Sequence, residues 1–212
     1  MKIFVIFFIL IFTSFVQSKA YAQKEINNGK FSLPYKTLSL PGNLDNIPFF
    51  NSNSPELVTT EGILLSTFPQ SDKIHPDAHL NRTFEGRFDI FTHHITPQIS
   101  FKRFYQGILI KNATNKEVVL KIISASTYLT KEATFKKLPD FTRNFGEYFA
   151  GPGDRVSQDI LRAKRITLFD KKPIILLKPN ETYILMNLPL VPGNERTSQF
   201  KLESDGPVYI AD

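Results

Sequence analysis

The sequence predicts an all-β protein: an antiparallel β-sandwich with an irregular N-terminal segment and one short helix. Three observations lead to this prediction. Apolar and polar side chains alternate over several short segments, which is the period of a half-buried strand. Clusters of Gly, Pro and Asn separate those segments. Strands do not alternate with long helical patterns, so a parallel sheet is not expected.

The first 22 residues have the pattern of a secretory signal peptide. Lys2 precedes an apolar run from Ile3 to Val16, and the triplet Ala20-Tyr21-Ala22 follows as a small-residue processing site. An uncleaved membrane anchor is the alternative, but the run is shorter than the ~20 residues that a membrane span needs. We predict cleavage after Ala22, a periplasmic or secreted protein, and no transmembrane span in the mature chain.

The charge of the mature chain is only mildly basic. Loss of Lys2 and Lys19 lowers the 26 basic residues to 24, against 20 acidic residues, so the formal charge falls from +6 to +4. The densest basic spots are the pairs Lys136-Lys137 and Lys171-Lys172, and no basic stripe forms. We therefore expect no nucleic-acid partner.

Cysteine is absent although the signal peptide directs the chain to an oxidising compartment. Stability must then come from a packed core without disulfides, for which the mature chain is long enough. Because the chain has 20 Phe and no Trp, Phe is expected to dominate this core.

The mature N-terminus is expected to be irregular. Residues 23–37 are polar, contain the turn signal Asn27-Asn28-Gly29, and are predicted to be a mobile leader. The sandwich domain is assigned to residues 38–212. Its first part, through Pro55, is rich in Pro, Gly, Asn and Ser, so we expect short extended pieces anchored by Phe49 and Phe50.

Two strands and a loop are expected next. Residues 57–68 have a β-like composition that Gly62 interrupts, which predicts a strand with a bend or bulge. Residues 69–81 form a polar loop. Residues 84–95 alternate regularly and predict a half-buried strand, with one face carrying a polar row defined by Glu85, Arg87, Asp89 and His93.

Three hairpins are predicted in the remainder of the chain. The central one spans residues 101–129 around the turn 111–116, in which Asn112 and Asn115 suit left-handed dihedrals. The second spans residues 173–190 around the turn 178–181. The third pairs residues 200–202 with residues 208–211 around Ser204-Asp205-Gly206-Pro207.

A single helix is predicted between the first two of these hairpins. Residues 130–148 show no persistent period and are expected to be a crossover loop. Asp154 is a candidate N-cap for a helix that ends near Lys164, with Val156, Ile160 and Ala163 on its apolar stripe.

The sequence contains few motifs that indicate catalysis. It lacks a G-x-S-x-G nucleophile motif, a thiol, a P-loop and a G-x-G-x-x-G fingerprint. His75 and His79 are candidate metal ligands, but Pro76 disfavours the helix that would bring both rings to one side, and His93-His94 on a strand would face opposite ways. Surface or hydrogen-bonded histidines are the favoured interpretation, with no cofactor.

The polar row offers the remaining candidates for chemistry. Glu85 and Asp89 are candidate glycosidase carboxylates with His93 beside them, because such chemistry needs two carboxyl groups about 5–10 Å apart and this row is expected to supply that spacing. A solvated or salt-bridged sheet face is favoured over this alternative. Arg87, Asp154 and Arg155 are candidate binding residues, although the last two fit helix capping better than catalysis.

The chain resembles an uncharacterised exported cyanobacterial family that is labelled only as a domain of unknown function. Five segments carry the resemblance: Asn51 to Glu56, Glu61 to Pro69, Gly86 to Phe91, Ala150 to Arg155, and Ser204 to Tyr209. It covers residues 38–212. Members of that family are about twice as long, so the resemblance implies that this chain corresponds to the N-terminal half of its relatives. The family supplies localisation and lineage, with no activity or site to carry over.

The C-terminus allows two interpretations. Asp212 follows an apolar strand by one residue, which fits a domain that ends on its last strand or a truncated product whose partner strands are missing. The resemblance favours truncation.

These observations together favour an exported, non-catalytic structural or binding module of the cell envelope. An envelope polysaccharide or another envelope protein is the expected partner. A carbohydrate-active hydrolase that uses carboxylates of residues 84–95 is one alternative. A metal-dependent binding protein is another.

Overall fold

The structure is a computed structural model that describes residues 25–27, 30–32, 46–98, 103–131 and 152–212. The chain divides into two compact units, Met1–Leu44 and Asp45–Asp212. In the first unit, β1 (Glu25–Asn27) and β2 (Lys30–Ser32) pair antiparallel. Residues 28–29 of the predicted turn lie outside the described residues. The predicted signal peptide lies outside the described residues.

The second unit is built on one mixed seven-stranded sheet. Its strands are β3 (Phe49–Ser52), β4 (Phe84–Ile95), β5 (Phe104–Asn112), β6 (Val118–Lys131), β7 (Ile174–Leu177), β8 (Thr182–Leu190) and β9 (Asn194–Ala211). Only the β3–β4 pair among them is parallel. The all-β class is therefore confirmed, while the arrangement as a sandwich stays a prediction.

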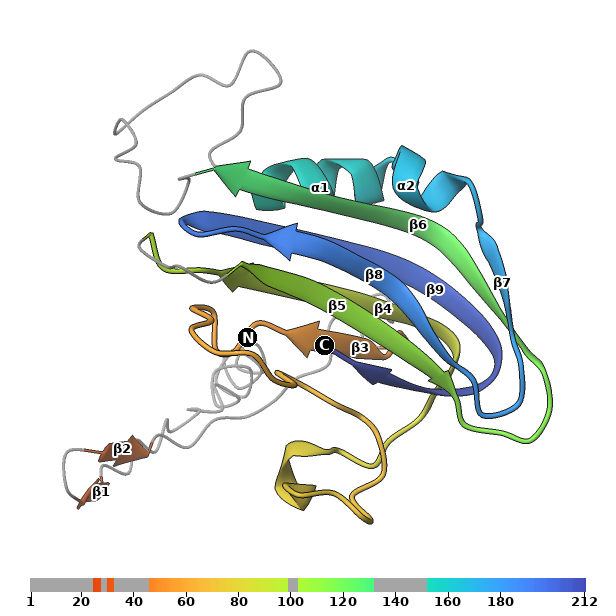
Figure 1. Ribbon diagram of the computed structural model, residues 1–212, viewed down its shortest axis with the longest axis horizontal. Helices are drawn as coiled ribbons and strands as arrows, with labels where there is room; N and C mark the ends of the chain where they lie inside the picture. Colours follow the sequence, from red (N-terminus) through yellow and green to blue (C-terminus); the bar gives the residue numbers. More distant parts are fainter. Residues whose placement is uncertain (1–24, 28–29, 33–45, 99–102, 132–151) are drawn as a thin grey trace, which may run out of the picture. The chain divides into compact units, whose positions relative to one another are not determined.

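The long strand β9 organises this sheet. One of its edges pairs with β4; the other pairs first with β6, as far as Ser204, and then with β5 from Val208 to Ala211. Figure 1 shows β9 curving round at the right-hand side, so that its last residues run back beside β5. Because of this curvature, β9 lies between β4 and β6 over most of its length and between β4 and β5 near its end.

The core of the second unit contains five buried Phe and six buried Ile, so Phe contributes to the core but does not dominate it as predicted. Its fully buried members include Phe50, Phe88, Ile90, Ile108, Ile110, Leu120, Ile175, Leu177, Phe200, Leu202 and Ile210. Arg196 of β9 reaches across to β8, where its Nη2 donates to the carbonyl oxygen of Pro189 at 2.8 Å. Burial lowers the pKa of Arg196. The alternation of apolar residues along β4, β5 and β9 thus places one face of each strand in a common core.

Two of the predicted hairpins are wrong, although their turns are present. β5 and β6 do not pair with each other, and neither do β7 and β8: β5 pairs with β8 and β9, and β6 with β7 and β9. The Asn112 side chain joins the two connections, because its Nδ2 donates to the carbonyl oxygens of Lys116, Leu177 and Lys178 at 2.6, 3.2 and 3.0 Å. A turn signal shows where the chain reverses, whereas core packing selects the neighbouring strand.

The third predicted hairpin is also wrong, because residues 194–211 form one continuous strand. Gly206 is buried within this strand. A Cβ added there would meet Cγ2 of Val118 at 2.8 Å, closer than real side chains approach. This glycine therefore allows the close approach of Val118, and does not mark a tight turn.

The segment 57–68 does not form the predicted strand. It makes isolated bridges only, at Leu57 with Ile95 and at Ser66 with His79 and Ala211. Gly62 has a φ of 153°, in keeping with the predicted bend. The polar loop that follows contains a single turn of 3₁₀ helix, η2 (Pro76–Ala78).

The predicted helix is present as α1 (Pro152–Leu161) and packs against β6 and β9. Val156 and Ile160 are buried, as expected. Two details are corrected. Asp154 lies inside the helix and is not its N-cap, and Ala163 lies beyond the helix with a φ of 53° and an exposed side chain.

A short second helix, α2 (Thr167–Asp170), was not predicted. It places Phe169 in the core, where its ring meets that of Phe200 at 4.9 Å between centroids. Residues 132–148 of the predicted crossover loop lie outside the described residues. No helix in the described part of the chain is long and apolar enough to cross a membrane.

Candidate functional site

The polar row lies on the solvent side of β4, and two of its four members, Arg87 and His93, contact acidic side chains nearby. Arg87 Nε lies 3.8 Å from Glu203 Oε2. His93 Nδ1 contacts Thr197 Oγ1 at 2.8 Å, and its Nε2 contacts Glu56 Oε1 at 3.2 Å. The row therefore has the contacts of a salt-bridged sheet face.

The two carboxylates of the row, Glu85 and Asp89, both lie on β4, where Glu85 is exposed. The register of β4 against β9 shifts between Phe84 and Gly86, and Gly86 has a φ of 69°. The use of Glu85 and Asp89 as a glycosidase pair stays a prediction. Burial raises the pKa of Asp89, and the neighbouring Lys201 partly opposes this shift.

The candidate metal ligands are not brought together. His79 is buried, and its Nδ1 contacts Ser66 Oγ at 2.8 Å, whereas His75 is exposed beside η2. His93 and His94 point to opposite faces of β4, as predicted. Among the described residues, no three His, Cys, Asp or Glu side chains gather at a spacing that could hold a metal ion.

Arg155 belongs to a buried network that fixes α1 to β6. Its Nε lies 3.2 Å from the Tyr128 hydroxyl and 3.6 Å from Asp159 Oδ2. Asp159 is 1 % exposed and accepts hydrogen bonds from Ser126 Oγ at 3.2 Å and from Tyr128 at 3.1 Å. This arrangement gives Arg155 a structural role. Asp154 precedes it in the same helix.

A buried cluster of Ser52, His94 and Asp212 has the residue types of a hydrolase triad. The His94 Nε2 lies 3.0 Å from Asp212 Oδ2 and 3.2 Å from Ser52 Oγ, and its Nδ1 donates to the carbonyl oxygen of Pro55 at 3.0 Å. A working triad places acid and hydroxyl on opposite ring nitrogens. Here both share Nε2, and Ser52 is 1 % exposed, so the hydroxyl is not a nucleophile that substrate could reach.

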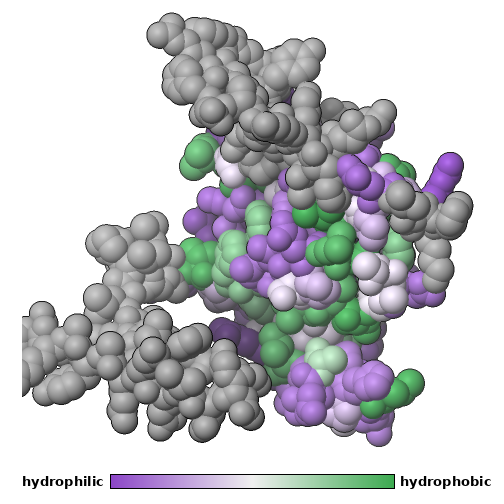
Figure 2. Space-filling view, turned by 90° about the vertical axis from the view of Figure 1, so that its left-hand side faces the viewer, coloured by the Kyte–Doolittle hydropathy of each residue, from purple (hydrophilic) through white to green (hydrophobic). Residues whose placement is uncertain are grey.

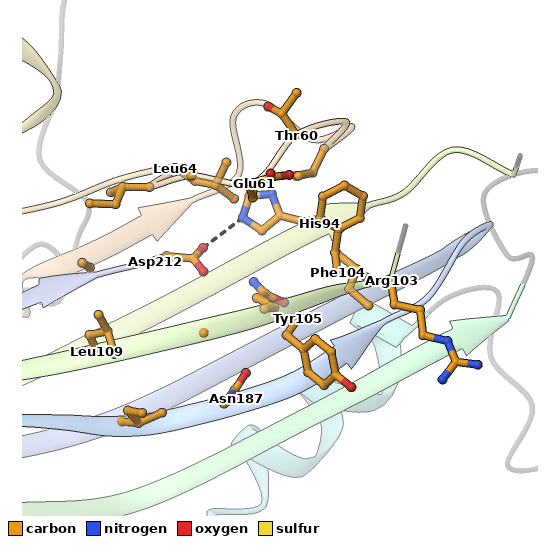
Figure 3. Close-up of a pocket in the computed structure, with 18 residues that line it drawn as sticks. Thr60, Glu61, Leu64, His94, Arg103, Phe104, Tyr105, Leu109, Asn187 and Asp212 are labelled. Carbon is orange, nitrogen blue, oxygen red and sulfur yellow. Dashed lines mark hydrogen bonds and ion pairs between the residues drawn. The ribbon is translucent and has the colours of Figure 1, made fainter. Parts of the chain in front are cut away.

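A pocket of about 690 Å³ lies next to this cluster (Figure 3). One wall is the segment 58–64, and the opposite wall is the beginning of β5 with part of β8. Asp212 and Ala211, at the end of β9, also line the pocket. The pocket is lined by Val58, Thr60, Glu61, Gly62, Ile63, Leu64, His94, Arg103, Phe104, Tyr105, Gln106, Gly107, Leu109, Ile184, Asn187, Leu190, Ala211 and Asp212.

Gln106 gives this pocket its most informative polar group. The residue is 4 % exposed, and neither its Nε2 nor its Oε1 has a hydrogen-bond partner within the described part of the chain. Buried amides are almost always paired, because an unpaired group forfeits its hydration without compensation. An amide that lines a pocket with both atoms unpaired is suited to a ligand that supplies one donor and one acceptor.

The rim of the pocket is apolar and exposed. Tyr105, Ile63 and Ile184 are 60, 58 and 56 % exposed. The end of the sheet where β4 stops and β5 begins faces the viewer in Figure 2, which shows apolar and polar side chains interspersed there. A concave site with apolar walls and few polar groups is the usual form of a binding pocket.

The pocket was not foreseen from the sequence. One signal was available: Gln106 is a polar residue among the buried, core-facing positions of an otherwise apolar strand, between Phe104 and Ile108. The Ser52–His94–Asp212 cluster had no such signal, because its members are 42 and 118 residues apart.

Comparison with known proteins gives one match. Residues 36–212 match a family described as a protein of unknown function, DUF3370. No curated protein and no solved structure matches the chain.

Proposed function

Since the chain belongs to the DUF3370 family of proteins of unknown function, we propose its function from the geometry of the site: an exported, non-catalytic binding module of the cell envelope. The binding site of this module is the pocket between residues 58–64 and β5. The export step rests on the apolar run and the Ala20-Tyr21-Ala22 triplet of the N-terminus.

The unpaired amide of Gln106 carries the binding part of the proposal. A buried amide without partners costs about 1–3 kcal/mol of stability. Groups that destabilise the free protein in this way are common where function requires them, because a ligand then supplies the missing partners. The exposed Tyr105 ring beside it offers apolar contact area for the same ligand.

The arrangement of charged groups supports a module without catalysis. The polar row lies on the solvent face of β4, whereas His94, which lines the pocket, lies on the buried face of the same strand. His94 and Asp212 border the pocket, but their side chains are 0 and 1 % exposed and pair with each other. A general acid or base must reach the proton that it transfers, so neither group is well placed for that role.

The proposal is tested with the purified mature protein and two fractions of the cell envelope, polysaccharide and protein. Wild type should bind a component of one fraction. Tyr105→Ser, which removes the exposed ring at the rim, should weaken that binding at least about tenfold. The matched control is Leu176→Ser, because Leu176 is 54 % exposed on β7 and lies outside the pocket.

Two results would contradict the proposal. One is equal binding by wild type and Tyr105→Ser. The other is release of reducing ends from the polysaccharide fraction by wild type and not by the double variant Glu85→Gln, Asp89→Asn, which would establish the hydrolase alternative.

A further inference from the structure

We infer that one edge of the second unit, formed by residues 161–172 and termed the α1–α2 edge, binds the surface of an anionic lipid bilayer. This inference goes beyond the proposed function and does not involve the pocket. Three features carry it: a high density of positive charge, two exposed leucines among the cations, and hydrogen bonds that hold the segment along β6.

Positive charge is concentrated in the α1–α2 edge. Its twelve residues contain five basic side chains and one acidic one, which gives a formal charge of +4, whereas the whole chain of 212 residues carries +6. The five cations are all exposed: Arg162, Lys164, Arg165, Lys171 and Lys172. Charges gathered on one surface in this way attract anions over about one Debye length, about 8–10 Å at physiological ionic strength.

Acidic neighbours neutralise only part of this charge. Arg165 Nε lies 3.2 Å from Asp170 Oδ1, and Lys164 Nζ lies 3.5 Å from Oδ1 of the buried Asp159. The other three cations have no acidic partner among the described residues. They therefore remain available to an anionic ligand.

Two leucines of this edge are exposed although a neighbouring residue in the sequence is buried. Leu161 is 85 % exposed and follows the buried Ile160 at the end of α1, and Leu168 is 53 % exposed and precedes the buried Phe169 of α2. Successive residues of a helix point about 100° apart. Each helix therefore directs one apolar side chain into the core and another to solvent. Exposed leucines flanked by cations are typical of segments that lie at a membrane interface.

Hydrogen bonds hold this edge against β6. The carbonyl oxygen of Lys164 accepts from Ala125 N–H at 3.0 Å, and that of Pro173 accepts from Ile122 N–H at 2.7 Å. Three residues of strand separate the two anchor points on β6, so these points lie at most about 11 Å apart. Residues 164–173 thus form a compact connection on one short stretch of β6, and Figure 1 shows α1 and α2 lying in succession along that strand.

A hollow of about 280 Å³ beside α2 brings apolar and basic side chains of this edge together. Leu168 and Lys172 line it, with Tyr183 and the 56 % exposed Ile184 of β8. Lys172 Nζ lies over the Tyr183 ring, 5.2 Å from its centroid. Lysine and tyrosine combine an apolar body with a polar tip, which suits the boundary between lipid headgroups and acyl chains.

The exposed leucines favour a lipid surface over a soluble polyanion. Both kinds of ligand could pair with the cations, but an acidic polysaccharide or a free phosphate offers no apolar layer for Leu161 and Leu168. At a bilayer, the leucines enter the interface while the cations contact anionic headgroups. One ligand then satisfies both features of the α1–α2 edge.

The experiment measures the partition of the mature protein onto sedimented vesicles. The probes are vesicles of phosphatidylglycerol and phosphatidylcholine in equal parts, vesicles of phosphatidylcholine alone, and soluble polygalacturonate. The protein should bind the mixed vesicles at least about tenfold more tightly than the neutral ones. Added salt should weaken this binding, because it screens the attraction between the cations and the headgroups.

Paired variants test the cations. Lys171→Gln combined with Lys172→Gln should weaken binding to mixed vesicles about 25-fold, since each cation near an anionic surface contributes about fivefold. Lys171→Arg combined with Lys172→Arg keeps both charges and should bind like wild type. The matched control, Lys73→Gln combined with Lys116→Gln, removes the same charge from exposed positions elsewhere and should change binding by about twofold or less.

A second pair tests the apolar contact. Leu161→Ser combined with Leu168→Ser should weaken binding to mixed vesicles at least about tenfold. Leu80→Ser is the control, because Leu80 is 57 % exposed in the loop 69–81, and it should leave binding unchanged. Thermal unfolding of each variant, measured in parallel, separates lost binding from lost folding.

Several outcomes would overturn the inference. It fails if mixed vesicles are not bound, if neutral vesicles are bound equally well, or if the control pair of lysines matters as much as Lys171 and Lys172. It also fails if polygalacturonate is bound and the two Leu→Ser changes have no effect, because the ligand is then a soluble polyanion. None of these outcomes decides the proposed function, which has its own test at the pocket.

Discussion

Replacement of Gln106 by Leu should stabilise the protein, which is unusual for a polar residue in a strand. Gln106 is 4 % exposed and both amide atoms lack partners. Leu keeps the approximate size of the side chain and removes an unsatisfied group whose burial costs about 1–3 kcal/mol. We therefore expect the free energy of unfolding to rise by about 1–3 kcal/mol. For a chain of this length, each kcal/mol raises Tm by about 2–4 °C.

Urea denaturation, followed by circular dichroism, measures this change. The midpoint should rise while the slope stays constant, because the amount of surface exposed on unfolding is nearly unchanged. Gln98→Leu is the matched control: Gln98 is exposed, so the same substitution there should change stability by about 0.5 kcal/mol or less. A Gln106→Leu protein that is less stable than wild type would show that the amide is satisfied in solution, and the main support for the binding pocket would be lost.

Three further predictions concern other parts of the molecule. The double variant Glu85→Gln, Asp89→Asn should fold normally. Asp89→Asn alone should be slightly more stable than wild type at pH 7, because burial raises the folded pKa of Asp89; urea melts at several pH values should show this advantage beginning to fade as the pH falls through the raised folded pKa and absent below about 3.9, the pKa of unfolded Asp. Asp159→Ala should cost about 3 kcal/mol by removing the acceptor that holds α1, and an unchanged urea midpoint would refute that role. N-terminal sequencing of exported protein should begin at Gln23, and an intact signal peptide on that protein would refute the proposed export.

The parts of the fold that were predicted correctly are those in which local pattern decides the outcome. β4 spans Phe84–Ile95 as expected, because burial alternates from Phe88 to His94 and one face of the strand is buried. The helix α1 was predicted from the spacing of its apolar residues, and two of them, Val156 and Ile160, are buried as expected.

The hairpins failed for a different reason. A turn signal constrains only the few residues that reverse the chain, whereas strand pairing depends on which apolar faces meet in the core. Gly206 illustrates the difference. The sequence predicted a turn at this residue, whereas in the structure the missing Cβ leaves room for the side chain of Val118. β6 and β5 instead pair one after the other with the same edge of β9, and no local pattern encodes that.

The site shows the same limit. The polar row could be predicted because polar and apolar residues alternate along β4. Its contacts, however, are those of an ordinary solvent-exposed sheet face. The pocket is assembled from segments 58–64, 103–109 and 184–190 and from the end of β9, which are far apart in sequence. Only Gln106 carried a local signal, as a polar residue at a core-facing position.

The most direct test of the central claim is site-specific photo-crosslinking in cells that export the protein. A photoreactive phenylalanine derivative replaces Tyr105 at the rim of the pocket or, as the control, Leu176 on β7. The account predicts that position 105 gives a discrete covalent adduct with one envelope component and that position 176 gives none. Absence of an adduct at position 105, or the same adducts at both positions, would contradict the claim that this pocket is a binding site.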